Sequence, residues 1–212
     1  MLKPEDFSPN LDFAFEIGAK HPAGIKLAGS LPHELIPEDC EANWVSHHNE
    51  LVETVLWFGE LGQSGKRSAL ILADTITEYS GDLIQAPISE VGKYVYDPNP
   101  ALVRSHLLGA FAIENALWAI APAIAYLCSN SELSSPWLRG FEVIESLPLD
   151  VKRIARRMSE LDIGTLEIKK RGVDITPEQL RPKLKLKGKN AATLILTRVG
   201  DARKALVCQP LS

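Results

Sequence analysis

Lysine and arginine side chains crowd the C-terminal third of the sequence, and the chemistry open to them is the binding of phosphate groups. Residues 151–212 contain 15 Lys and Arg against 6 Asp and Glu, a net charge of +9. Positive charge that acidic neighbours do not cancel indicates a polyanionic partner, most plausibly nucleic acid. The residues that we expect to contact phosphates are Lys152, Arg153, Arg156, Arg157, Lys169, Lys170, Arg171, Lys185 and Lys187, with Lys183 and Lys189 in the same basic set.

Two other interpretations of the same charges stay open. Lysine on a helix face or an edge strand keeps a protein in solution and protects the edge from aggregation, without any ligand. Residues 1–100 hold 6 Lys and Arg against 16 Asp and Glu, so an acidic front half and a basic back half could neutralise each other in a protein-interaction module. Few aromatic residues interleave with the charges, which argues against a platform for stacked single-stranded bases.

No other group of residues predicts a reaction. His47 and His48 lie near Cys40, but a cysteine pair and an i, i+4 histidine pair are both missing, and neighbouring residues of a strand point to opposite faces. Glu142 and Glu145, three apart in an expected strand, also point apart, and His21, His33 and His106 have no visible partner. We therefore assign no catalytic, cofactor-binding or metal-binding residue, and a free-standing enzyme of unknown chemistry remains a third interpretation.

Composition indicates a soluble cytoplasmic protein with no membrane partner. The 212 residues are 45% hydrophobic, enough for one sizeable core or two small ones. Cys40, Cys128 and Cys208 are far apart with no CxxC, as in a chain with reduced thiols, and no apolar leader follows Met1. The one long apolar stretch, residues 107–128, is interrupted by polar residues and a proline, so we expect a buried helix followed by a strand.

The first half of the chain predicts strands and one apolar helix. The Gly-bracketed loop 62–67 separates two β-rich runs, at 51–58 and 68–73, and predicts an antiparallel hairpin of these two runs. Asn99 as N-cap and Pro100 at the first helical position predict a buried apolar helix that extends to Ile113. Further expected segments are strands at 24–29 and 124–128, a loop at 74–92 that contains at most one short strand, and a polar loop at 129–136.

The last third predicts a β-α-β-α-β-β unit. Apolar residues recur at helical spacing over 151–161, and Thr176 to Gln179 form a capping box that opens a helix which Pro182 keeps short. The remaining segments are strands at 141–145 and 165–169 and a hairpin of 192–199 with 204–208 across Gly200-Asp201. Trp137 is expected to anchor the core at the entrance of this α+β unit.

Two sets of segments together resemble one family. The first set, Ile25-Lys26-Leu27, Trp44-Val45-Ser46, Leu51 to Trp57 and Ala69 to Leu72, resembles the last three strands of a class I S-adenosylmethionine (SAM)-dependent methyltransferase sheet, closed by an antiparallel pair. The second set, Tyr94 to Arg104, Phe141 to Pro148 and Ile168 to Val173, is similar to the THUMP-like C-terminal domain of a group of bacterial methyltransferases.

The resemblance implies an α/β remnant of a Rossmann-like methyltransferase sheet over residues 1–92, a helical connector over 93–135 and an α+β THUMP-like domain over 136–212. It implies a role in positioning structured RNA, either tRNA or rRNA, for methylation. The Gly-rich turn and the Asn/Asp-Pro-Pro-aromatic motif of the family are missing, so we expect that this chain alone neither binds SAM, the cofactor of the full-length family, nor has activity. An open sheet edge would serve a homodimer or a separate cofactor domain.

Overall fold

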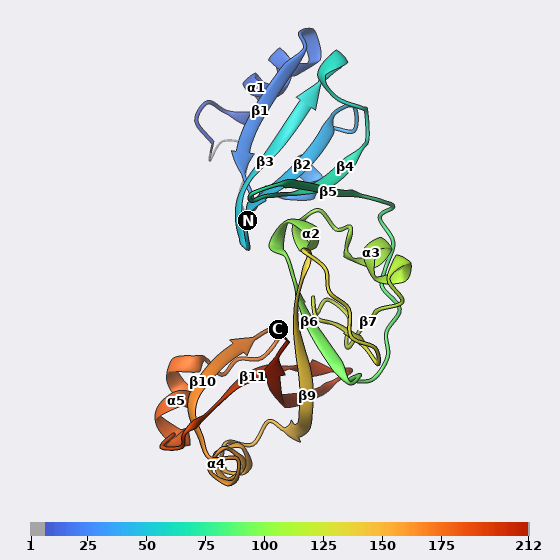
Figure 1. Cartoon of the computed structure of the whole chain (residues 1–212). Helices are drawn as coiled ribbons and strands as arrows, with labels where there is room; N and C mark the ends of the chain where they lie inside the picture. Colours follow the sequence, from blue (N-terminus) through green and yellow to red (C-terminus); the bar gives the residue numbers. More distant parts are fainter. Residues whose placement is uncertain (1–6, 212) are drawn as a thin grey trace. The chain divides into compact units, whose positions relative to one another are not determined.

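A computed structural model describes residues 7–211, which form two compact units (Figure 1). The first unit comprises the chain up to Gln85 together with Asn99–Phe111. The second comprises Ala86–Pro98 and the chain from Ala112 onward. Each unit is built around its own β-sheet. None of the helices formed by residues 7–211 has the length and apolar character that a membrane crossing requires.

The sheet of the first unit has five strands in the order β1-β3-β2-β4-β5. The pair β2–β4 is parallel, and the other neighbours are antiparallel. The strands are β1 (Ala23–Ala28), β2 (Glu41–His47), β3 (Glu50–Phe58), β4 (Arg67–Leu72) and β5 (Ile76–Ser80), with short 3₁₀ turns η2 (His33–Leu35) and η3 (Gly59–Leu61).

The hairpin predicted from residues 51–58 and 68–73 is wrong. β3 pairs instead with β2, which precedes it by only two residues, His48 and Asn49. A connection this short costs little loop-closure entropy, and β1 occupies the other edge of β3. β4 can therefore add only at the free edge of β2, where it runs parallel.

Helices α1 (Leu11–Lys20) and α2 (Pro100–Arg104) complete the first unit. A side chain at Gly18 of α1 would collide with the ring of Phe58, so glycine allows the helix to approach the sheet. Asn99 is the N-cap of α2, as predicted, and accepts a hydrogen bond of 2.9 Å from the Ala101 backbone N–H. The same side chain accepts from the Ser46 hydroxyl at 2.9 Å and donates to the His48 carbonyl at 2.8 Å. Asn99 therefore fastens α2 to β2.

The single apolar helix expected between Asn99 and Ile113 is wrong in its extent. Two helices occupy this stretch, α2 and α3 (Leu108–Glu114), because His106 has a positive φ of 62° that an α-helix does not contain. Ile113 is 52% exposed rather than buried. Further on, the strand expected at 124–128 begins only at Leu127, after a turn in which Ala123 has φ 57°.

The second unit contains the predicted β-α-β-α-β-β succession. It runs as β9 (Leu138–Pro148), α4 (Val151–Glu160), β10 (Ile163–Lys170), α5 (Pro177–Leu184), β11 (Asn190–Val199) and β12 (Ala202–Pro210). The terminal hairpin and the Thr176 capping box are present as predicted. β6 (Tyr94–Pro98), β7 (Trp118–Ala119) and β8 (Leu127–Ser129) extend the sheet to seven strands in the order β10-β11-β12-β9-β6-β8-β7.

Each face of this sheet has its own apolar cluster. α4 and α5 cover one face, where Ile154, Met158 and Leu180 pack with Leu194 of β11. The next residue, Ile195, points to the other face, because successive side chains of a strand alternate. There it packs among the residues that join and follow β7 and β8, and with Phe141 of β9. Trp137 is buried at 4% exposure, consistent with a core anchor.

Candidate nucleic-acid interface

Helix α4 presents its cations on the face opposite the core. Ile154 and Met158 are buried beneath the helix, and Asp150 caps it by accepting a hydrogen bond of 2.8 Å from the Arg153 backbone N–H. Lys152 and Arg153 are exposed, and neither forms an ion pair with any residue in the described part of the chain. These two side chains are therefore available to an external anion.

The other two cations of α4 are already paired. Arg157 donates to Glu145 of β9 at 2.6 Å and to Glu160 at 3.2 Å. Arg156 lies 3.5 Å from Glu160, one helical turn further along. The i, i+4 spacing of Arg156 and Glu160 is visible in the sequence, whereas the partner on β9 depends on the fold.

The segment Lys169-Lys170-Arg171 does not form a single basic cluster. Lys169 and Arg171 point to one side of β10, where Asp97 of β6 accepts hydrogen bonds of 2.7 and 2.8 Å from them. Lys170 points to the other side and is exposed. The side chain of Asp97 is only 12% exposed and that of Lys169 only 18%, so this contact is largely shielded from water.

The contact with Asp97 belongs to a larger charge network. Arg139 of β9 donates two hydrogen bonds of 2.9 Å to Glu167 of β10, and its guanidinium lies 5.2 Å from the centre of the Phe141 ring. In a flat sheet, β6 and β10 would lie about 19 Å apart, four strand spacings. Asp97 nevertheless contacts Lys169, so the sheet is strongly curved and the network spans its concave side.

A lysine-rich segment begins in the last turn of α5 and continues beyond it. Lys183, Lys185, Lys187 and Lys189 are exposed and alternate with Leu184 and Leu186, which pack on the core. The segment lies directly along β10: a side chain on Gly164 would collide with the Gly188 backbone, and the Gly188 N–H donates to the Ile163 carbonyl at 3.2 Å. Among residues 7–211 no acidic side chain pairs with these four lysines.

The nine residues predicted from the sequence thus fall into two groups. One group is exposed and unpaired within residues 7–211, and its members, the free cations, are Lys152, Arg153, Lys170, Lys185 and Lys187. The other group is paired, and its members, the paired cations, are Arg156, Arg157, Lys169 and Arg171. Sequence reasoning missed Asp97 and Arg139, because strands distant in the chain bring them to β10.

His33 and His106, which have no partner visible in the sequence, stack on each other in the first unit with ring centroids 3.7 Å apart. Nδ1 of His33 lies 2.6 Å from Nη1 of Arg67, and Nε2 lies 2.6 Å from the Arg104 carbonyl oxygen. A guanidinium only donates and a carbonyl only accepts, so His33 is neutral with its proton on Nε2. Burial is the main cause of a His33 pKa lowered to about 4, with His106 and Arg67 acting in the same direction.

Residues 7–211 contain no group of three His, Cys, Asp or Glu side chains that could hold a metal ion. The three cysteines are free and buried, and burial raises the pKa of the Cys40 and Cys128 thiols to about 11. Thiols with pKa values this high are poor nucleophiles.

The family model described as THUMP domain-like matches residues 138–210. This span begins at β9 and ends with β12, and it contains every free and paired cation defined above. The chain carries a THUMP-like domain. The THUMP-like domain expected from the sequence is confirmed on this point.

Two curated proteins of Mycobacterium tuberculosis, from strains CDC 1551 / Oshkosh and ATCC 25618 / H37Rv, are similar to this chain. Each is named as an uncharacterized S-adenosylmethionine-dependent methyltransferase and is 34% identical over 175 residues. The alignment covers 80% of this chain and 48% of each relative. The chain is thus homologous to SAM-dependent methyltransferases. It spans about half the length of the curated relatives it matches.

A crystal structure of a Porphyromonas gingivalis W83 protein assigned as a methyltransferase has the same fold. The TM-score is 0.78 at 20% identity, and the match covers 95% of this chain and 54% of that chain. At this identity the likeness concerns the fold alone. It confirms the expected combination of a methyltransferase-like α/β sheet and a THUMP-like α+β module.

Proposed function

We propose that this chain is the RNA-binding and substrate-positioning portion of a SAM-dependent methyltransferase. The observation that carries the proposal is the set of free cations on the THUMP-like domain, contributed by α4, β10 and the segment after α5. The homology to methyltransferases supplies the reaction class. The proposal includes the three segments expected from the sequence, which are residues 1–92, 93–135 and 136–212, and a cytoplasmic location.

The free cations suit the phosphate backbone of structured RNA. Duplex RNA is recognised mainly by its shape and its phosphates, because its deep major groove hides the base edges. The lysine and arginine side chains of this set are exposed on α4, on β10 and along the segment after α5, and no carboxylate within residues 7–211 forms an ion pair with them. The paired cations would contribute less, since a phosphate must displace a carboxylate.

We propose that residues other than those of the two sheets bind SAM, because the sheet of the first unit does not have the features of a SAM site. SAM sites of class I enzymes lie where parallel strands run into helices through glycine-rich turns. Among the described strands of the first unit, β2–β4 is the one parallel pair, and neither strand is followed by a helix. No catalytic step is therefore assigned to the residues of this chain.

The free edge of β1 supports a partner for the first unit. β1 pairs with β3 on one side, and no strand among residues 7–211 pairs with its other side. Unpaired backbone groups along an edge favour the addition of another strand. We propose that a cofactor-binding domain adds there, and a homodimer through the same edge is the alternative that sedimentation of the isolated chain would reveal.

Neutralisation of free and paired cations tests the RNA-binding role. The variant K185Q/K187Q should lower the slope of log Kd against log salt for a fluorescein-labelled tRNA by about 2, roughly one unit for each lost phosphate contact. The control K20Q/K26Q removes the same charge from the first unit and should leave the slope unchanged. The variant R157Q should change it by less than one unit, since Glu145 and Glu160 already hold this guanidinium.

A change in slope proportional to the number of charges removed in all three variants, two for each double variant and one for R157Q, would show that only net charge matters and would contradict a defined interface. An absence of RNA affinity in the folded wild-type chain would favour the protein-interaction module. Fluorescence anisotropy gives the affinities, and circular dichroism confirms that each variant is folded.

A further inference from the structure

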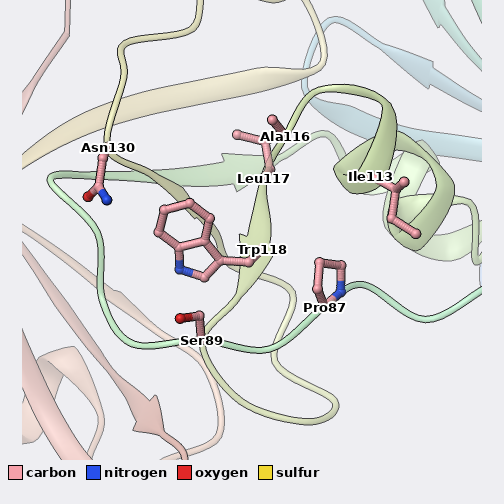
Figure 2. Close-up of a pocket in the computed structure, with 7 residues that line it drawn as sticks. All are labelled: Pro87, Ser89, Ile113, Ala116, Leu117, Trp118 and Asn130. Atoms are coloured by element: carbon pink, nitrogen blue, oxygen red, sulfur yellow. The ribbon is translucent and has the colours of Figure 1, made fainter.

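An apolar pocket of about 470 Å³ lies in the second unit, beside β7 (Figure 2). The ring of Trp118 lies between Asn130 on one side and Pro87 and Ile113 on the other (Figure 2). Ser89 lies at its rim. The pocket is distinct from the free cations, none of which lines it.

The indole of Trp118 is held in place before any ligand arrives. Its Nε1–H donates to the Glu90 carbonyl at 2.7 Å. A side chain at Gly92 would lie 2.9 Å from the indole ring and would collide with the Ser129 carbonyl, so glycine allows the ring to pack closely. The backbone bond from the Ala119 N–H to the Pro87 carbonyl, 2.8 Å, fixes the opposite wall.

The polar groups of the pocket stand at its rim. The Asn130 Oδ1 accepts from the Lys93 backbone N–H at 3.2 Å, which orients the side-chain amide. No residue in the described part of the chain accepts from the Asn130 amide N–H₂ or bonds to the Ser89 hydroxyl. An apolar concavity of this volume with a few placed polar groups is typical of sites for small planar ligands.

We propose that this pocket takes one unstacked nucleobase, which stacks on Trp118 and hydrogen-bonds through its edge to Asn130 and Ser89. A base has an apolar face for the indole and a polar edge for the amide and the hydroxyl, and single-stranded RNA is commonly read in this way. An apolar peptide side chain would fill the pocket but form no hydrogen bond with either polar group. The inference goes beyond the phosphate contacts proposed above, because it concerns a base and a separate set of residues.

Nucleosides test the pocket without the phosphate backbone. Adenosine and uridine are titrated into the ¹⁵N-labelled chain, and the four tryptophan indole N–H signals are followed by NMR, with W118F assigning one of them. At least one nucleoside should shift the Trp118 signal while those of Trp44 and Trp57 stay in place. W118A should weaken binding at least about fivefold, the lower limit for loss of a stacked base, whereas W118F, which keeps an aromatic platform, should retain it.

Three outcomes would overturn the proposal. The first is a Trp118 signal that does not move even when the nucleoside concentration is 10-fold above the millimolar range in which nucleosides usually bind. The second is an equal shift of this signal with inorganic phosphate. The third is displacement of the nucleoside by an apolar dipeptide, together with an N130A variant whose affinity for the nucleoside is unchanged. The variant K185Q/K187Q separates this site from the proposed RNA-binding surface, since it should lose RNA affinity and keep the nucleoside shift. Failure of the nucleoside shift with intact RNA binding would reject the pocket alone.

Discussion

At the scale of single residues, pairing decides what a charge can do. Of the nine cations named from the sequence, the structure places Lys169 and Arg171 against Asp97 and leaves Lys170 exposed. Strand alternation predicts this separation of neighbours from the sequence alone. The identity of the partner could not be predicted, because Asp97 reaches β10 only through the curvature of a sheet whose intervening strands lie far along the chain.

Replacement of Asp97 by asparagine should destabilise the second unit. Two largely shielded cations would lose their carboxylate, at a cost of about 1–3 kcal/mol, reduced from the fully buried case because Arg171 is 34% exposed. Hydrogen exchange of the β10 and β11 amides measures this loss. In the matched variant K170Q, the free energy of opening obtained from this exchange should change by less than about 0.5 kcal/mol. Similar effects of the two variants would mean that the network carries no stability.

The stack of His33 on His106 predicts a pH-dependent stability of the first unit. His33 has a pKa of about 4 in the folded chain and about 6.5 when unfolded. Between these values only the unfolded chain binds the proton, so stability falls as the pH is lowered from 6.5 to 4. Burial also lowers the pKa of His106, and Arg67 and Arg104 act in the same direction. The loss should be about 1–2 kcal/mol, because the ring is only partly buried and solvent screens part of the effect.

The variant H33N tests the origin of that pH dependence. An asparagine oxygen can still accept from Arg67 but does not titrate, so thermal unfolding of H33N should vary less between pH 6.5 and pH 4 than unfolding of the wild type. An unchanged pH dependence would assign the effect to carboxylates elsewhere.

At the scale of elements, local signals were predictable and non-local pairing was not. The Gly200-Asp201 hairpin, the Thr176 capping box and the helical period of α4 each lie within a few residues, and all three are present. The loop at 62–67 led to the wrong prediction of a hairpin, because a loop bracketed by glycines indicates a turn but does not show which strand edge is free to pair. His106 ended the expected helix through a positive φ that no sequence rule for histidine predicts.

The cap at Asn99 gives a prediction at this scale. N99A should destabilise the first unit by about 2–3 kcal/mol, because it removes the α2 cap, leaves the His48 carbonyl without its partner and leaves the buried Ser46 hydroxyl with the Leu70 carbonyl alone. N10A removes the exposed cap of α1 and should cost about 1 kcal/mol or less. Thermal unfolding compares them, and equal losses would refute the fastening role of Asn99.

At the scale of the whole molecule, the acidic front half and basic back half are the feature that the sequence showed most plainly. The structure gives each half a sheet of its own, and the paired cations find their carboxylates within the second unit. The candidate base pocket was not visible in the sequence, since its residues come from three separate stretches and Trp118 has no distinctive neighbours. From the sequence we predict an anionic partner, whereas the positions of the groups that would contact it depend on the fold.

The salt dependence of RNA binding by the intact chain tests the central claim most directly. If each of the five free cations contacts one phosphate, log Kd for a structured RNA should change with log salt with a slope of magnitude about 3–5 between 50 and 200 mM NaCl. Fluorescence anisotropy with a labelled tRNA measures it. A slope within that range supports an RNA-positioning surface on the THUMP-like domain. A slope near zero, or no affinity even at the lowest salt, would contradict it.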